Sequence, residues 1–318
     1  LWMTVPFAVY LVALSVKTFF ASILNAEHLY GPLPVASALG ALTTLAVIAT
    51  LRQLLSVVAI PCGSLAGELV SVGVLAASAR SRGIAIVPTF ARPQPVHRIA
   101  RLVASEVAGG AVTRLNPVVD QLMAALAGVA GAGTMLKLSG DVAMVPTSLL
   151  QAALLPILLS HLSDDFAAGH IAKLRSTVRR ALTSVTVILV AASGFIWAVR
   201  LPLLRVIFAH GAMDAAGIDR MARILPYHLL GVAPFGALLV LARAHVAAQN
   251  SRIMLSMGVL NAGVNAGLNV VFLSVLGLEG LALSTSCTYA VVAVVFAVRL
   301  ESRLATTSTA SPTAEILP

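Results

Sequence analysis

Apolar stretches of about 20 residues, separated by short polar or basic segments, dominate the pattern of this chain. Stretches of that length cross the hydrocarbon core of a membrane as α-helices, whereas the strands of a membrane β-barrel need only about 10 alternating residues. The pattern therefore predicts an all-α, polytopic membrane protein with about nine transmembrane helices. The approximate predicted spans are 2–23, 34–51, 54–78, 102–126, 138–160, 181–199, 222–242, 253–275 and 279–298.

Composition supports this class and argues against others. Hydrophobic residues make up 59% of the chain and charged residues 10%, and the mean hydropathy is +0.97. Soluble domains carry about 25% charged residues, so a soluble globule is excluded. The net charge of +9 comes from basic residues in short loops, which indicates membrane topology rather than nucleic-acid binding. The chain shows no nucleotide-binding loop, zinc-ligand spacing or nucleophile elbow, so we expect no enzyme.

The basic residues predict the orientation of the chain. Thirteen of them lie in 80–101, 173–180, 243–252 and 299–303, and the opposite set of connections carries six. Cytoplasmic segments are enriched in Lys and Arg, so we expect a cytoplasmic C-terminus and, with nine spans, an external N-terminus. No signal peptide is visible at the start. This topology predicts three further helices upstream of residue 1.

A row of asparagines marks the predicted span 253–275. Asn261, Asn265 and Asn269 recur every four residues and share one helix face. Such a row is costly in lipid and must face another helix, a wet cavity or an ion; hydrogen bonding between helices alone would also explain it. The next span carries four hydroxyl residues, which either join this row or bond carbonyls of their own helix. They are Ser284, Thr285, Ser286 and Thr288.

The predicted span 102–126 is the richest in polar groups, with Glu106, Arg114, Asn116, Pro117 and Asp120. Asn116 and Asp120 share a face, and Glu106 points in a similar direction. A proline weakens the backbone ladder and frees carbonyls that can coordinate a cation. We therefore expect a cation or substrate site at Asp120; the alternative is a pair between Arg114 and an acid that locks helices together.

Four further charged residues lie in the predicted spans or directly beside them. Lys17 and Glu68 could line a cavity, although the long side chain of Lys17 could also reach to the interface. Lys137 and Asp141 are four residues apart, which favours an ion pair on one helix face.

Six stretches between about 98 and 298 carry a resemblance to a known family. They are VVDQLMAAL (118–126), LSGDVAMVPTSLL (138–150), LSHLSDDFAAGH (159–170), VIFAHGAMDAAGID (206–219), VLARAHVAAQNSR (240–252) and LGLEGLALSTS (276–286). In order and spacing this region resembles the MurJ/MviN lipid II flippase family of the multidrug/oligosaccharidyl-lipid/polysaccharide exporter superfamily. The segment 23–39 is more weakly similar.

The resemblance implies a partial two-bundle exporter fold in which the nine spans are the family's helices four to twelve. On that basis we expect four regions. They are the second half of an N-terminal bundle at 1–80, a basic cytoplasmic linker at 81–101, a six-helix bundle at 102–300 and a disordered cytoplasmic tail at 301–318.

The resemblance also implies a cation site that couples transport to a sodium ion or a proton; no other cofactor is expected. The matching positions are Asp120, Asn265, Asn269, Thr285 and the backbone carbonyl of Leu281. Asn269 stands where the family's sodium-binding pattern has an acid, which removes a charge. The other candidates for cavity lining or substrate contact are Lys17, Glu68, Glu106, Arg114, Asn116, Lys137, Asp141 and Asn261.

The implied function is alternating-access transport of lipid II, a lipid-linked peptidoglycan precursor, across the bacterial inner membrane to the periplasmic leaflet. Asp141 lies where the family has an arginine for pyrophosphate, and Lys137, one turn away, could substitute. That departure keeps two alternatives open: a polysaccharide-unit or drug exporter, and a non-transporting scaffold for cell-wall synthesis enzymes. The expected partners are the lipid-linked oligosaccharide, membrane lipids and, under the scaffold alternative, those enzymes; nucleic acid is not expected.

Overall fold

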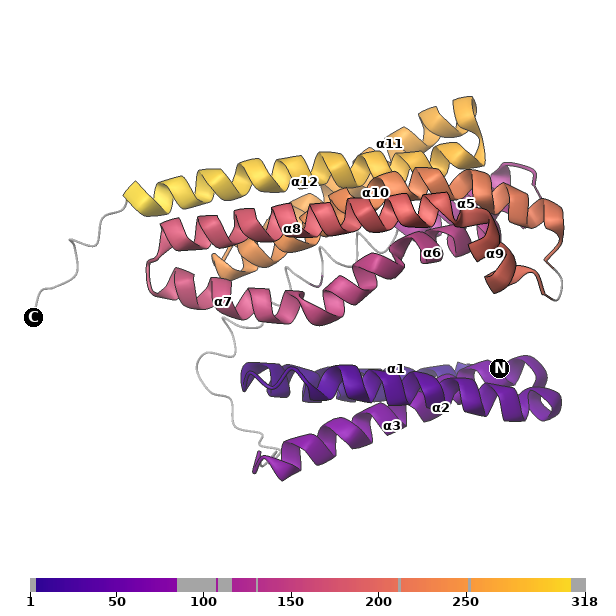
Figure 1. Cartoon of the computed structure of the whole chain (residues 1–318), viewed down its shortest axis with the longest axis horizontal. Helices are drawn as coiled ribbons and strands as arrows, with labels where there is room; N and C mark the ends of the chain where they lie inside the picture. Colours follow the sequence, from indigo (N-terminus) through magenta and orange to yellow (C-terminus); the bar gives the residue numbers. More distant parts are fainter. Residues whose placement is uncertain are drawn as a thin grey trace, which may run out of the picture. The chain divides into compact units, whose positions relative to one another are not determined.

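The computed structural model describes residues 4–84, 107, 116–129, 131–210, 213–250 and 253–309. Within these ranges every regular element is a helix (Figure 1). The chain divides into two compact units, Leu1–Arg92 and Pro93–Pro318.

The smaller unit contains α1 (Thr4–Ala26), α2 (Pro32–Leu55), the 3-10 turn η1 (Ser56–Val58) and α3 (Ala59–Ser81). Small residues bring α2 and α3 into backbone contact: a Cβ atom added to Gly67 would lie 2.4 Å from the carbonyl oxygen of Gly40. Ser71 Oγ donates to the carbonyl of Ala36 at 3.0 Å across the same contact. Close approach at small side chains is the usual way in which membrane helices pack without a hydrophobic driving force.

The larger unit contains eight described helices. They are α5 (Asn116–Leu126), α6 (Ala132–Ala153), α7 (Leu155–Ala167), α8 (Ile171–Ala198), α9 (Arg200–Phe208), α10 (Ala215–Ala247), α11 (Ile253–Leu276) and α12 (Leu278–Thr309). Helix α10 is the central element, and it packs against α6, α7, α8 and α12 (Figure 1). Its first turn is capped by Asp214, whose side chain accepts a hydrogen bond from the Gly217 backbone N–H at 2.8 Å.

The described helices confirm a polytopic membrane protein. Six helical stretches are long and apolar enough to cross a membrane, or seven if the bent pair α6–α7 is one span. One of the six, Pro32–Ser81, holds both α2 and α3, and these are antiparallel because Gly63 lies against Thr44 while Gly67 lies against Gly40. More than half of the predicted span 102–126 lies outside the described residues. Its last part, from Asn116, is the helix α5.

Two sequence expectations are wrong in their boundaries. The predicted span 138–160 is instead two helices, α6 and α7, that meet at a bend of 48°. Pro156 lies in the first turn of α7, where a proline fits, but its missing N–H prevents a straight continuation of α6. The tail expected to be disordered from residue 301 is helical to Thr309, because Leu300 and Leu304 are buried and Glu301 pairs with Arg175 at 3.0 Å.

Candidate cation site in the larger unit

The three asparagines of α11 all point into the larger unit. Asn261, Asn265 and Asn269 are buried, whereas neighbouring valines on the same helix are exposed. Polar side chains are costly in lipid, so a polar row in a membrane helix is expected to face other helices. Asn261 accepts a hydrogen bond from the Asn116 side chain, which joins α5 to α11.

Asp120 lies where α5, α11 and α12 meet. Asn269 Nδ2 donates to its Oδ1 at 2.6 Å, and Thr285 Oγ1 contacts its Oδ2 at 3.2 Å. Thr285 Oγ1 also lies 3.2 Å from the carbonyl oxygen of Leu281. Asn265 completes the group, because its Oδ1 accepts from Asn269 Nδ2 at 3.2 Å. The structure therefore gathers all five residues that the family resemblance nominated.

The side chains around Asp120 have few N–H and O–H donors for the acceptors that they contact. Both N–H groups of the Asn269 amide are engaged, one with Asp120 and one with Asn265, while its oxygen accepts from Ser284. The Thr285 hydroxyl has one proton for two acceptors, the Asp120 carboxylate and the Leu281 carbonyl. The two acceptors therefore share this proton, unless Asp120 itself carries a proton or these oxygens hold a cation.

No positively charged side chain pairs with Asp120 in the part of the chain that the structure describes. Its partners are neutral donors, which orient a carboxylate but do not cancel its charge. Carboxylate, hydroxyl and carbonyl oxygens are the ligands that hard cations prefer. Asp120, Thr285 and Leu281 thus present a suitable set, whereas Asn269 turns its nitrogen toward Asp120 and would have to rotate to ligate.

A chamber of about 160 Å³ adjoins this cluster, lined by residues of α5, α6, α10 and α12. Asp120 and Thr285 lie on its wall, as do Lys137 and Asp141, which form an ion pair of 2.5 Å. This ion pair confirms the expected pairing along one helix face. Both of its members are more than half exposed, at 57% and 58%. The chamber is large enough to hold several water molecules.

His228 also lines the chamber and was missed as a site residue. The predicted span 222–242 puts position 228 close to one end of its helix. Instead α10 begins at Ala215, and His228 is buried with its ring over Gly140. Its Nε2 atom has no hydrogen-bond partner among the described residues. A histidine inside an otherwise apolar stretch was the available sequence clue.

The four hydroxyl residues of α12 were expected either to join the asparagine row or to bond carbonyls of their own helix, and both arrangements occur. Ser284 and Thr285 join the asparagine row, whereas Thr288 bonds the carbonyl of Ser284 on its own helix. Ser286 does neither and donates to the carbonyl of Tyr227 on α10 at 2.5 Å. Glu106 and Arg114 lie outside the described residues, so the alternative of a pair between Arg114 and an acid stays a prediction.

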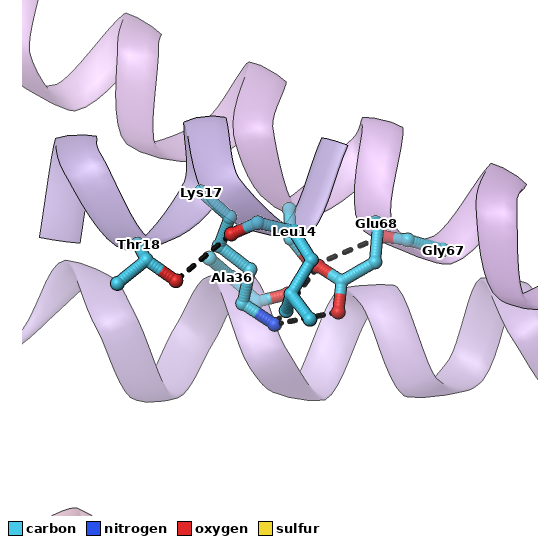
Figure 2. Close-up of polar contacts among 7 residues, drawn as sticks. Leu14, Lys17, Thr18, Ala36, Gly67 and Glu68 are labelled. Carbon is cyan, nitrogen blue, oxygen red and sulfur yellow. Dashed lines mark hydrogen bonds and ion pairs between the residues drawn. The ribbon is translucent and has the colours of Figure 1, made fainter. Parts of the chain in front are cut away.

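In the smaller unit, Lys17 of α1 and Glu68 of α3 form an ion pair (Figure 2). Lys17 Nζ lies 3.1 Å from Oε1 and 3.0 Å from Oε2 of the Glu68 carboxylate. The two side chains are only 18% and 12% exposed, so the pair is largely withdrawn from solvent. The side chain of Lys17 is directed toward Glu68 rather than along α1. Their role in lining a cavity stays a prediction.

Similar solved structures show which fold the chain has. The chain matches an outward-facing multidrug resistance MATE family transporter of the MOP superfamily with a TM-score of 0.79 at 13% identity, over 93% of this chain and 67% of that one. It matches the inward closed conformation of the lipid II flippase MurJ with a TM-score of 0.69 at 16% identity, over 94% of this chain and 63% of that one. These likenesses show the fold that such transporters share.

Sequence comparison then gives the family. The family described as lipid II flippase MurJ matches residues 3–314, so the chain belongs to the MurJ family. A probable lipid II flippase MurJ from Rhizobium tropici is 26% identical over 206 residues, which cover 64% of this chain and 38% of that relative. The chain therefore spans less than half the length of this curated relative.

Proposed function

We propose that the chain acts in an alternating-access transporter that flips lipid II from the cytoplasmic to the periplasmic leaflet of the bacterial inner membrane. Membership of the MurJ family supports the substrate class. The observation that carries the mechanism is Asp120, a carboxylate shared by three membrane helices without a fixed counter-ion in the described part of the chain. Ionisable groups within membrane helices commonly mark ion pathways.

Occupancy of Asp120 is the proposed coupling step. A proton on the carboxyl would let Asp120 donate to Thr285 Oγ1 while Thr285 donates to the Leu281 carbonyl, which satisfies both 3.2 Å contacts. If sodium is the coupling ion, Asp120, Thr285 and the Leu281 carbonyl would hold it, and it would neutralise the carboxylate. Either ion binds α5 to α12, and its loss leaves an uncompensated charge among the helices. A ligand that binds two states unequally shifts their populations.

Lys137 is the proposed contact for the pyrophosphate of the substrate. It lines the chamber beside Asp120, and its present partner is the carboxylate of Asp141. An exposed pair of this kind contributes little stability, so a phosphate oxygen can replace Asp141 at low cost. The chamber then places a substrate contact close to the candidate ion site.

The Lys137–Asp141 pair also supports a second candidate function. Because Asp141 already neutralises Lys137, the chamber has less positive charge than a pyrophosphate would require. A related exporter of neutral polysaccharide units or cationic drugs would not need that charge. Competition by a pyrophosphate-bearing lipid distinguishes the two, since only the lipid II transporter is inhibited by it.

The proposed function is tested in a bacterium depleted of its own lipid II flippase. The chain is expressed alone and together with the sequence that flanks it at its locus, and lipid II exposed on the outer leaflet is measured. We expect Asp120→Asn to reduce the flipping rate roughly tenfold, equivalent to about 1.4 kcal/mol. Asp164→Asn, which removes an exposed carboxylate on α7, is the matched control. Unchanged flipping in Asp120→Asn would contradict ion coupling at this site and favour the scaffold alternative.

A further inference from the structure

A groove of about 480 Å³ runs between α8 and α10, which lie side by side in the larger unit (Figure 1). Its volume falls within the range of about 300–1,000 Å³ that is typical of small-ligand sites. The groove has a structural cause. Gly236 of α10 packs so tightly on α8 that an added Cβ atom would lie 2.2 Å from Leu189 Cδ1. The groove lies on the Trp197 and Pro226 side of this contact, between the same two helices.

The groove opens outward from the larger unit onto an apolar face. Val190, Trp197 and Leu230 line it and are more than half exposed. Gly194 contributes open space, because a Cβ atom added there would meet nothing within 4 Å. In a protein whose helices cross a membrane, exposed apolar side chains of this kind contact lipid chains. An extended hydrocarbon chain therefore matches the shape and chemistry of the groove.

Two polar groups accompany this apolar lining, one on the wall of the groove and one beyond Trp197. The hydroxyl of Ser193 is buried on its wall and has no hydrogen-bond partner in the described residues. Trp197 follows one helical turn after Ser193, and the guanidinium of Arg200, the first residue of α9, lies over its ring at 5.3 Å and donates to its carbonyl at 2.9 Å. Arg200 forms no ion pair with an acid in the described part of the chain. Most of its five N–H donors are therefore available.

We propose that this groove binds an anionic membrane phospholipid. One acyl chain lies between α8 and α10, the phosphate contacts Arg200, and an ester carbonyl accepts the hydrogen bond of Ser193. Ser193 and Trp197 are about 6 Å apart along the helix axis, which suits a lipid whose headgroup sits at the aromatic level and whose ester groups lie one turn deeper. Cationic side chains near a membrane surface attract anionic headgroups.

The bound lipid has a structural consequence. It fills the groove on one side of the Gly236 contact and so links α8 to α10 there. Under the orientation predicted from the basic residues, this end of the bundle faces the outer leaflet. The lipid site does not depend on the proposed function, since it is distinct from Asp120 and its chamber.

The test measures lipid binding to the purified protein by native mass spectrometry and by the shift of the unfolding temperature. Phosphatidylglycerol and phosphatidylcholine with identical chains are the probes. We expect phosphatidylglycerol to bind more tightly than phosphatidylcholine. Arg200→Gln should reduce that preference roughly fivefold. Arg205→Gln, which removes the same charge from an exposed position on α9, should leave most of it.

A second variant fills the groove without creating a clash. Gly194→Leu should weaken the binding of both lipids, whereas Gly263→Leu on α11, where an added Cβ atom also meets nothing within 4 Å, should not. The unfolding temperature without lipid shows whether each variant folds. Equal affinity for the two lipids, or unchanged binding to Gly194→Leu, would overturn the proposal. So would a Gly194→Leu variant that changes only the oligomeric state, because the groove would then be an interface between copies of the chain.

Discussion

Each unit of this protein places an acid among membrane helices, and the two acids are stabilised in different ways. Glu68 in the smaller unit is neutralised by Lys17, a cation fixed to the neighbouring helix. Asp120 in the larger unit is held by Asn269 and Thr285, which are neutral. Because Lys17 already neutralises the Glu68 carboxylate, that carboxylate has little affinity for a mobile cation. The difference teaches that buried charge alone does not identify an ion site. We propose Asp120 as the ion site because no cationic side chain pairs with it in the described part of the chain.

Breaking the smaller unit's pair should produce the largest loss of stability. Lys17→Met leaves the Glu68 carboxylate uncompensated and largely buried, so we expect a loss of about 3 kcal/mol in the free energy of unfolding. The double variant Lys17→Met, Glu68→Gln should recover most of it, because no charge is then left unpaired. Thermal unfolding in detergent measures both. A double variant as unstable as the single one would show that the pair is not what Lys17 contributes.

Adding a second acid to the larger unit should sharpen the contrast. Asn269→Asp places two carboxylates at the junction of α5, α11 and α12, where their repulsion favours a bound cation. At a sodium concentration about 100 times the dissociation constant of the variant, we expect sodium to raise the variant's free energy of unfolding by about 2.7 kcal/mol. At the same concentration the free energy of unfolding of the natural chain should rise by less. Titration of the unfolding temperature with sodium, with choline as the control cation, measures this. Equal sodium effects on the two proteins would contradict a role for position 269 in ion binding.

The smallest effect is expected at the exposed pair on α6. Lys137→Gln should change the free energy of unfolding by no more than about 0.5 kcal/mol, since both partners are more than half exposed and only four residues apart. Substrate binding should nevertheless weaken if Lys137 contacts the pyrophosphate. A lipid-binding assay run beside the unfolding assay separates the two. A large loss of stability would show that the pair is structural.

The sequence predicted the helices better than their ends. Apolar length located α1, α2, α3 and α11 to within about five residues, because each is a single apolar stretch. It placed the start of α8 at 181, whereas the helix begins at Ile171, because the first turns of α8 are basic. It missed the bend between α6 and α7, since Pro156 gives no indication of whether a helix kinks or ends and restarts. It also ended α12 too early, because the contacts of Leu300 and Leu304 with distant helices cannot be seen in a local pattern.

The candidate site was predictable in part. The four-residue spacing identified the asparagine row, and the family resemblance nominated Asp120 and Thr285. Neither could show that the Asn269 amide turns its nitrogen to Asp120, because side-chain orientation depends on packing across helices 149 residues apart in the chain. His228 was missed for a similar reason: its burial depends on where α10 begins. Lys17 and Glu68 were each noted, yet their pairing requires the relative register of α1 and α3.

The most direct test of the central claim is the dependence of stability on cation concentration at Asp120. Unfolding temperatures of the natural chain and of Asp120→Asn are compared across sodium concentration and pH, with Asp164→Asn as the control. The account predicts that sodium or protons stabilise the natural chain and the control, that Asp120→Asn loses this dependence, and that Asp120→Asn is at least as stable as the natural chain in the absence of the ion. The same cation dependence in all three proteins would contradict the assignment of a mobile cation to Asp120.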